Sequence, residues 1–114
     1  FDSVSTNTQI LVSFIGLVVL PPIGEEILAR GYLLSGLRKR LNLLPSMLIV
    51  STLFAVAHLQ LGSGETLLWA AAINTFVLSI VLVYVKEKTG SLWPCIYIHG
   101  LNNLVAFMFL YVFV

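Results

Sequence analysis

The sequence has few charged residues and a single cysteine. Charged residues make up 10% of the 114 positions, well below the roughly 25% of soluble domains, so an ordinary soluble fold is disfavoured. Cys95 has no second cysteine to pair with, which excludes an internal disulfide. The net charge is +1 and no basic patch is present, so no nucleic-acid partner is expected. Without repeats or linkers, the chain is expected to form one domain.

Apolar side chains are what the sequence has in excess. Hydrophobic residues make up 59% of the chain and the mean hydropathy is +1.01. Four apolar segments cover residues 10–37, 43–61, 66–85 and 92–114. A helix needs about 20 residues to cross the hydrocarbon of a bilayer. We therefore predict an all-α, polytopic transmembrane helical bundle with about four membrane helices.

The first segment is too long for one straight span at about 1.5 Å per residue. Pro21 and Pro22 lie near its middle, and a proline removes a helical hydrogen bond and clashes with the preceding turn. We expect the first helix to be kinked or broken at these prolines. Turns between the later segments are expected at Gly62, Gly64 and Gly90.

The basic residues predict an orientation in the membrane. Five of the six Lys and Arg residues lie in the connection after the first segment or in the one after the third. The positive-inside rule assigns both connections to the cytoplasmic side. Because the sequence starts without Met and ends within an apolar run, we also expect it to be a piece of a longer membrane protein.

A few ionisable residues lie inside the apolar segments. A charge at the centre of a membrane helix costs roughly 2.5–3.5 kcal/mol, so these side chains should face the bundle interior. Glu26 and Arg30 are four residues apart, in the order that favours an ion pair. Glu25 lies about 100° round the helix, which leaves it as a free carboxylate that could accept a proton from water. A purely structural ion cluster is the alternative.

Two further patterns bring histidines into the apolar segments. FAVAH places Phe54 and His58 on one helix face, and HGLNN places His99 and Asn103 on another. Taken singly, each polar residue is more typical of an interhelical hydrogen bond. Together with Glu25 they match the parts of a hydrolytic site.

In that hypothesis Glu25 and His58 hold and deprotonate a water. His99 and Asn103 donate hydrogen bonds to the oxyanion of the tetrahedral intermediate. A zinc ion held by Glu25, His58 and His99, with a bound water, is the alternative. No HExxH motif is present, so spacing does not indicate zinc and no cofactor is firmly predicted.

Three motifs in order give the sequence a family resemblance. They are EExxxR (Glu25, Glu26 and Arg30), FxxxH (Phe54 and His58) and HxxxN (His99 and Asn103). Together they resemble the CPBP family of intramembrane proteases, which includes the type II CAAX prenyl endopeptidases (Rce1-like) and the bacterial Abi and bacteriocin-processing proteins. The resemblance extends over residues 20–107. One departure is Ala29, because the family often has an aromatic residue before the motif arginine.

The resemblance implies an intramembrane endopeptidase whose protease core is a single domain over residues 1–114. It implies that Glu25 is the catalytic carboxylate, that Glu26 supports it, that Arg30 fixes Glu26 and that Phe54 shapes the site. Metal-dependent and metal-free chemistry both stay open. The expected partners are a peptide or membrane-protein substrate and the lipid bilayer, in an integral protein of a bacterial plasma membrane; the oligomeric state is left open.

Two functions of other classes also fit the polar residues. One is a non-catalytic immunity or scaffold protein with the same fold. The other is a fragment of a proton-coupled transporter, since intramembrane Glu and His also mark proton relays. Each histidine has a motif partner four residues away, which favours hydrolysis over a relay chain.

Overall fold

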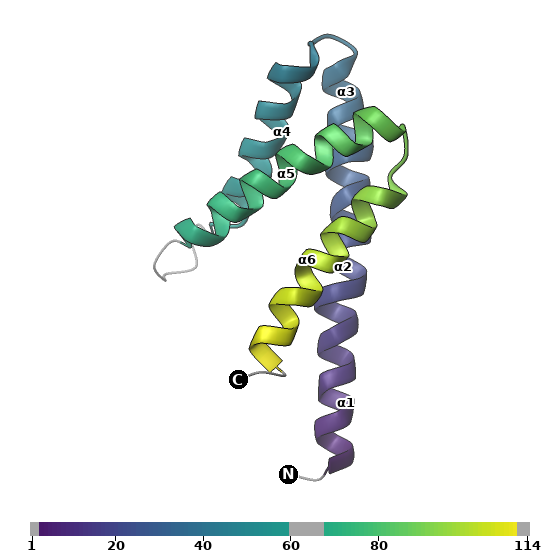
Figure 1. Ribbon diagram of the computed structural model, residues 1–114, viewed down its shortest axis with the longest axis vertical. Helices are drawn as coiled ribbons and strands as arrows, with labels where there is room; N and C mark the ends of the chain where they lie inside the picture. Colours follow the sequence, from purple (N-terminus) through teal and green to yellow (C-terminus); the bar gives the residue numbers. More distant parts are fainter. Residues whose placement is uncertain (1–2, 60–67, 112–114) are drawn as a thin grey trace.

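The computed structural model describes residues 3–59 and 68–111, and all of its elements are helical, as predicted. The elements are α1 (Ser3–Phe14), η1 (Ile15–Val19), α2 (Leu20–Glu26), η2 (Ile27–Leu33), α3 (Leu34–Arg38), α4 (Leu43–Ala57), α5 (Trp69–Thr89) and α6 (Trp93–Tyr111) (Figure 1). The first five join end to end into one long helix over residues 3–38, called here the N-terminal helix. The described chain therefore has four helices.

The N-terminal helix is kinked but not broken, so the first of the two predicted alternatives is confirmed. Two π-helical segments, η1 and η2, interrupt its regular winding on either side of α2. In η1 the backbone N–H of Leu20 donates to the carbonyl of Ile15, five residues back instead of four. A widened turn directly before Pro21 and Pro22 relieves the clash of their rings with the preceding turn.

The second helix is shorter than predicted. It was expected to run from Leu43 to Leu61, but α4 ends at Ala57, and His58 follows with φ −91° and ψ 0°. The backbone N–H of His58 donates to Ala55, while its ring Nδ1 lies 2.7 Å from the carbonyl of Phe54. The side chain thus takes the carbonyl that a continuing helix would use, which explains the early end.

The connection between α5 and α6 is also shorter than predicted. α5 continues to Thr89, so Lys86 and Lys88 belong to its last turn and not to a loop. Gly90 follows with φ +67°, a left-handed conformation that glycine adopts without strain, which confirms the predicted turn residue. The turn predicted around Gly62 and Gly64, and the adjoining ends of segments 43–61 and 66–85, lie outside the described residues.

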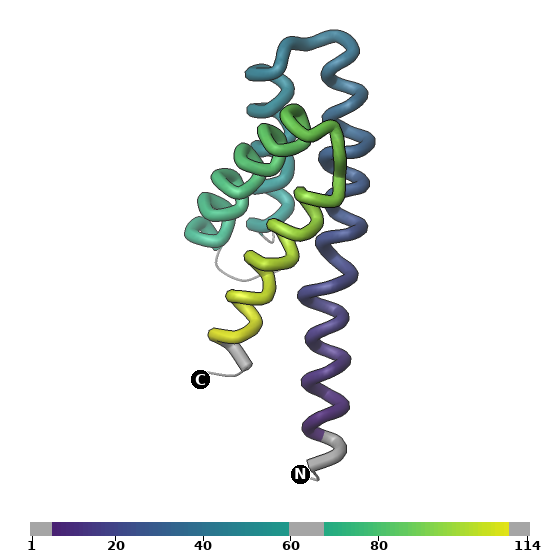
Figure 2. The backbone as a smooth tube through the Cα atoms, turned by 45° about the vertical axis from the view of Figure 1, so that its right-hand side comes forward, coloured from purple at the N-terminus to yellow at the C-terminus, as the bar shows by residue number. Residues whose placement is uncertain are grey.

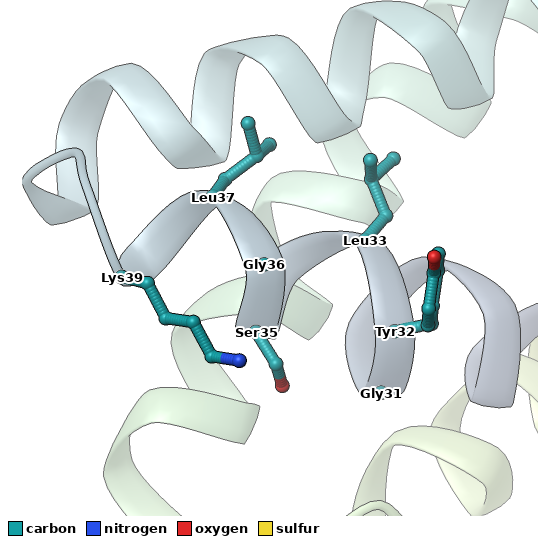
Figure 3. Close-up of a pocket in the computed structure, with 7 residues that line it drawn as sticks. All are labelled: Gly31, Tyr32, Leu33, Ser35, Gly36, Leu37 and Lys39. Carbon is teal, nitrogen blue, oxygen red and sulfur yellow. The ribbon is translucent and has the colours of Figure 1, made fainter.

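The helices pack as two pairs. α4 packs mainly on α5, and α6 runs back along η1 and α2 (Figures 1 and 2). One core cluster joins the N-terminal helix to α4 and α5; its members are Ala29, Leu34, Val50, Phe54 and Val83. Figure 3 shows Leu33 and Leu37 on one side of the N-terminal helix, where they pack against this core, and Ser35 and Lys39 on the other.

The distribution of polarity is that of a membrane bundle. Many large apolar side chains are exposed on every helix, Leu11, Leu28 and Leu53 among them. Polar residues are buried instead: Glu26, Arg30, Ser46, Ser51, Thr75, Ser79 and His99. Two helices, Thr6–Arg38 and Trp69–Thr89, are long and apolar enough to span a bilayer. Over the described residues, the prediction of about four membrane helices is thus met in part: two of the four helices pass this test, and α4 is a shorter apolar helix.

Candidate active site

Glu26 and Arg30 form the buried floor of the site. Both side chains have 0% exposure, and Arg30 Nη1 lies 3.3 Å from Glu26 Oε1, as the i,i+4 spacing predicted. The two groups are close enough to attract but are not aligned for a hydrogen bond, and the described residues provide no other acceptor for the guanidinium. The Arg30 guanidinium carbon instead lies 4.4 Å from the ring centroid of Phe54, a cation–π contact.

His99 connects this pair to α6. Its Nδ1 lies 2.7 Å from Glu26 Oε1, and its side chain is only 4% exposed. A hydrogen bond at Nδ1 fixes the plane of the ring and directs the other nitrogen, Nε2, away from Glu26. The Glu26–His99 contact joins residues 73 positions apart and was not predicted from the sequence.

Glu25 lies on the accessible side of the same site. One carboxylate oxygen is 3.4 Å from His99 Nε2, and the other is 3.9 Å from His58 Nε2. The Glu25 side chain is 37% exposed, whereas Glu26 is 0% exposed. Glu26 is therefore the buried member of the pair and Glu25 the accessible one, while the division into a supporting and a catalytic carboxylate stays a prediction. We call Glu25, Glu26, Arg30, His58 and His99 the carboxylate–histidine cluster.

His58 completes the cluster from the end of α4. A carbonyl oxygen can only accept, so the 2.7 Å contact with Phe54 requires that Nδ1 of His58 carries the proton. Its Nε2 then presents a lone pair on the side of Glu25. The backbone of His58 lies in the sparsely populated bridge region, where many active-site residues are found.

Phe54 contacts three members of the cluster. Besides Arg30, its ring faces His58 at a centroid distance of 4.9 Å and His99 at 5.8 Å. The i,i+4 spacing placed Phe54 beside His58, and the family resemblance implied that it shapes the site; its contacts with Arg30 and His99 were not predicted. The ring thus packs against the buried cation and against both imidazoles.

Asn103 has a partner that the sequence motifs did not predict. Its side-chain Nδ2 donates to the backbone carbonyl of Leu17, in η1, at 3.0 Å. The predicted hydrogen bond from Asn103 to an oxyanion stays a prediction. Leu17 could have been found from the sequence, because it lies four residues before Pro21 and five before Pro22.

The donor types of Glu25, His58 and His99 suit a zinc ion, and each histidine has its second nitrogen fixed by a further contact, as in many zinc sites. Their placement does not: among the described residues, no three His, Cys, Asp or Glu side chains converge as a metal site requires. The chemistry of the cluster is therefore derived from its own groups.

A separate surface hollow of about 410 Å³ lies on the outer face of η2 and α3 (Figure 3). Its lining runs from Gly31 to Lys39 and includes Tyr32 and Ser35. No member of the carboxylate–histidine cluster lines it, so this hollow is distinct from the candidate site.

Comparison with known families supports the resemblance seen in the motifs. The model of the family described as type II CAAX prenyl endopeptidase Rce1-like matches residues 7–105, which include every residue of the three motifs. No curated protein and no solved structure matches the chain.

Proposed function

The chain belongs to the Rce1-like family of type II CAAX prenyl endopeptidases, and from this premise we propose that it is an intramembrane endopeptidase. The family consists of intramembrane proteases. The observation that carries the proposal is the meeting of Glu25 with both histidine Nε2 atoms, at 3.9 and 3.4 Å.

Glu25 and His58 are the groups proposed to bind the nucleophilic water. Their 3.9 Å separation is too long for a direct hydrogen bond and suits two acceptors that share one water. Each can accept one water hydrogen, since Nδ1 of His58 already carries the imidazole proton. With 37% and 35% exposure, both side chains can be reached by water.

His99 is proposed to stabilise the oxyanion. Its Nε2 is a donor when the Glu26–His99 pair holds two protons, one on Nδ1 or Glu26 and one on Nε2. The low exposure of His99 and Glu26 strengthens a hydrogen bond to developing charge. The ion pair with Arg30 keeps Glu26 in place beside Nδ1 of His99.

The proposed reaction needs no group beyond these. Glu25 takes a proton from the water as its oxygen attacks the substrate carbonyl, and the oxyanion accepts from His99. When the tetrahedral intermediate collapses, the peptide C–N bond breaks and Glu25 returns the proton to the leaving amine. One water is consumed, and Glu25 is regenerated.

The proposed setting is a lipid bilayer that contains all four helices, with a peptide or membrane-protein segment as substrate. The connections at residues 39–42 and 90–92 would face the cytoplasm, because the basic residues cluster beside them. The ion pair of Arg38 with Glu87, at 2.5 Å, supports placing both connections at the same side of the membrane.

Cleavage of synthetic quenched-fluorescent peptides in proteoliposomes tests the proposal. One peptide should end in a prenylated CAAX sequence, and a matched peptide should lack the prenyl group. We expect Glu25→Ala, His58→Ala and His99→Ala to abolish cleavage while each protein still inserts normally. Retained cleavage by Glu25→Ala would overturn the proposed role of Glu25, whereas no cleavage by the unmodified protein would favour a non-catalytic scaffold.

A chelator added to the same assay tests the alternative of a metal-dependent reaction. The metal-free scheme predicts unchanged cleavage. Loss of activity on chelation, restored by zinc, would assign Glu25, His58 and His99 as ligands and require the cluster to contract around the ion.

A further inference from the structure

We propose that Asn103 is a positioning residue that acts through the carbonyl of Leu17, a backbone group left without a helical partner by the double proline. The kinetic part of this inference rests on the proposed peptidase function. The structural part rests only on the contact between α6 and η1.

The double proline leaves the Leu17 carbonyl without a donor in both helical registers. In an α-helix its donor would be the N–H of residue 21, and in a π-helix that of residue 22. Both positions are proline, which has no N–H. The π-helical turn η1 therefore cannot repair the loss at Leu17, although it can at Val18, whose π-register donor is the N–H of Ile23.

An unpartnered carbonyl is costly in the apolar interior of a bilayer, where no water replaces the missing donor. Asn103, on α6, supplies this donor: its Nδ2 lies 3.0 Å from the carbonyl oxygen of Leu17. The two helices are close here: a Cβ added at Gly100 would lie 3.7 Å from the carbonyl of Val18. The amide thus ties α6 to the N-terminal helix at one defined height.

The hydrogen bond between Asn103 and Leu17 affects the candidate active site through α6. His99 lies four residues before Asn103, one helical turn away, and meets Glu25 and Glu26 of the N-terminal helix. Two attachments between the same helices, at His99 and at Asn103, fix both their rotation and their register. Asn103 thereby keeps His99 Nε2 at its distance from Glu25.

A rescue experiment separates this role from oxyanion donation. Loss of an oxyanion donor typically lowers kcat about 100- to 1,000-fold. Replacing a proline that lies far from the reacting atoms would not restore that kcat. Loss of a positioning contact should be repaired by any donor that satisfies Leu17. Pro21→Ala returns a backbone N–H in the α register, and the carbonyl has two lone pairs, so it can accept from both donors.

The experiment compares Asn103→Leu with Asn103→Leu/Pro21→Ala in the full protein. Asn103→Leu keeps the side-chain size but removes the donor; we expect a lower Tm in detergent and a kcat about tenfold lower at unchanged KM. Adding Pro21→Ala should recover both. Asn102→Leu is the matched control, since the described residues show no hydrogen bond for Asn102, and Pro45→Ala controls for removing a proline elsewhere.

Several outcomes would overturn the inference. It is overturned if Asn103→Leu has the same Tm as Asn102→Leu, if its kcat falls and does not recover with Pro21→Ala, or if its Tm falls while kcat is unchanged. If Pro21→Ala does not fold, the comparison of Asn103→Leu with Asn102→Leu in Tm still decides. Because Tm needs no cleavage, failure of the peptidase proposal leaves the tie testable.

Discussion

Two adjacent glutamates have opposite surroundings in this protein. Glu26 is fully buried between Arg30 and His99, whereas Glu25 is partly exposed and meets the two Nε2 atoms. The difference follows from helical geometry, since neighbouring positions point about 100° apart. One residue can therefore serve the architecture while the next is available for chemistry.

Neutral isosteres at the two positions should separate these roles. Glu26→Gln leaves Arg30 as a buried charge without its partner, and we expect a loss of about 3–5 kcal/mol in the free energy of unfolding. Glu25→Gln should cost less than about 1 kcal/mol, because the Glu25 side chain is itself partly exposed, yet abolish cleavage. Reversible unfolding in mixed micelles measures the stability of both variants, and the peptide assay measures their cleavage. Equal stabilities would contradict the assignment of Glu26 as the supporting carboxylate.

At this scale the sequence predicts local contacts well and distant ones poorly. The pairing of Glu26 with Arg30 follows from i,i+4 spacing. The bond between Glu26 and His99 depends on how α6 packs, and no periodicity encodes that packing. The partner of Asn103 lies between these cases: the prolines identify Leu17 as an acceptor, but only the fold identifies the donor.

At the scale of helices, polar side chains determine where the elements end and how they meet. The hydrophobic pattern predicts a second helix through residue 61. Hydrophobicity alone carries no information on the contact of the His58 ring with the carbonyl of Phe54, which ends the helix earlier. The same local contact sets the orientation of the His58 ring. The shortened helix and the candidate site thus have a common cause.

The α4–α5 interface contains a pair of buried serines that can be tested by a double-mutant cycle. Ser51 Oγ donates to Ser79 Oγ at 3.0 Å. We expect Ser51→Ala and Ser79→Ala to couple by about 0.6 kcal/mol, a typical value between membrane helices. Ser46→Ala is the matched control, because its buried hydroxyl has no hydrogen-bond partner among the described residues. Coupling between Ser46 and Ser79 as strong as that between Ser51 and Ser79 would contradict a specific bond.

The end of α5 depends on a glycine in the left-handed region. Gly90 has φ +67°, so Gly90→Ala should cost roughly 1–2 kcal/mol in unfolding free energy. Gly36→Ala is the opposite case, since a Cβ there meets nothing within 4 Å, and it should stabilise the helix by about 0.5–1 kcal/mol. Thermal unfolding of both variants in one detergent gives the comparison. A destabilised Gly36→Ala beside a neutral Gly90→Ala would reverse the interpretation.

For the whole molecule, polarity is reversed relative to a soluble domain: polar groups lie inside and apolar groups outside. The composition predicted this reversal and the four-helix, all-α class. It could not predict that the N-terminal helix stays continuous, because proline permits either a kink or a break. The outcome depends on the π-helical turn before Pro21 and on packing against α6.

The arrangement also predicts where impermeant reagents reach the chain. The connections at residues 39–42 and 90–92 lie in the upper part of Figure 1, and Arg38 contacts Glu87 between them. We therefore expect Lys39→Cys and Lys88→Cys to react with a membrane-impermeant maleimide in inverted vesicles but not in intact cells, and Gln9→Cys to show the reverse. Native Cys95 is fully buried and should stay unlabelled, so the unmodified chain is the background control. Labelling of Lys39→Cys and Lys88→Cys from opposite sides would contradict the packing of the helices, whereas labelling of both only in intact cells would reverse the orientation and leave the packing intact.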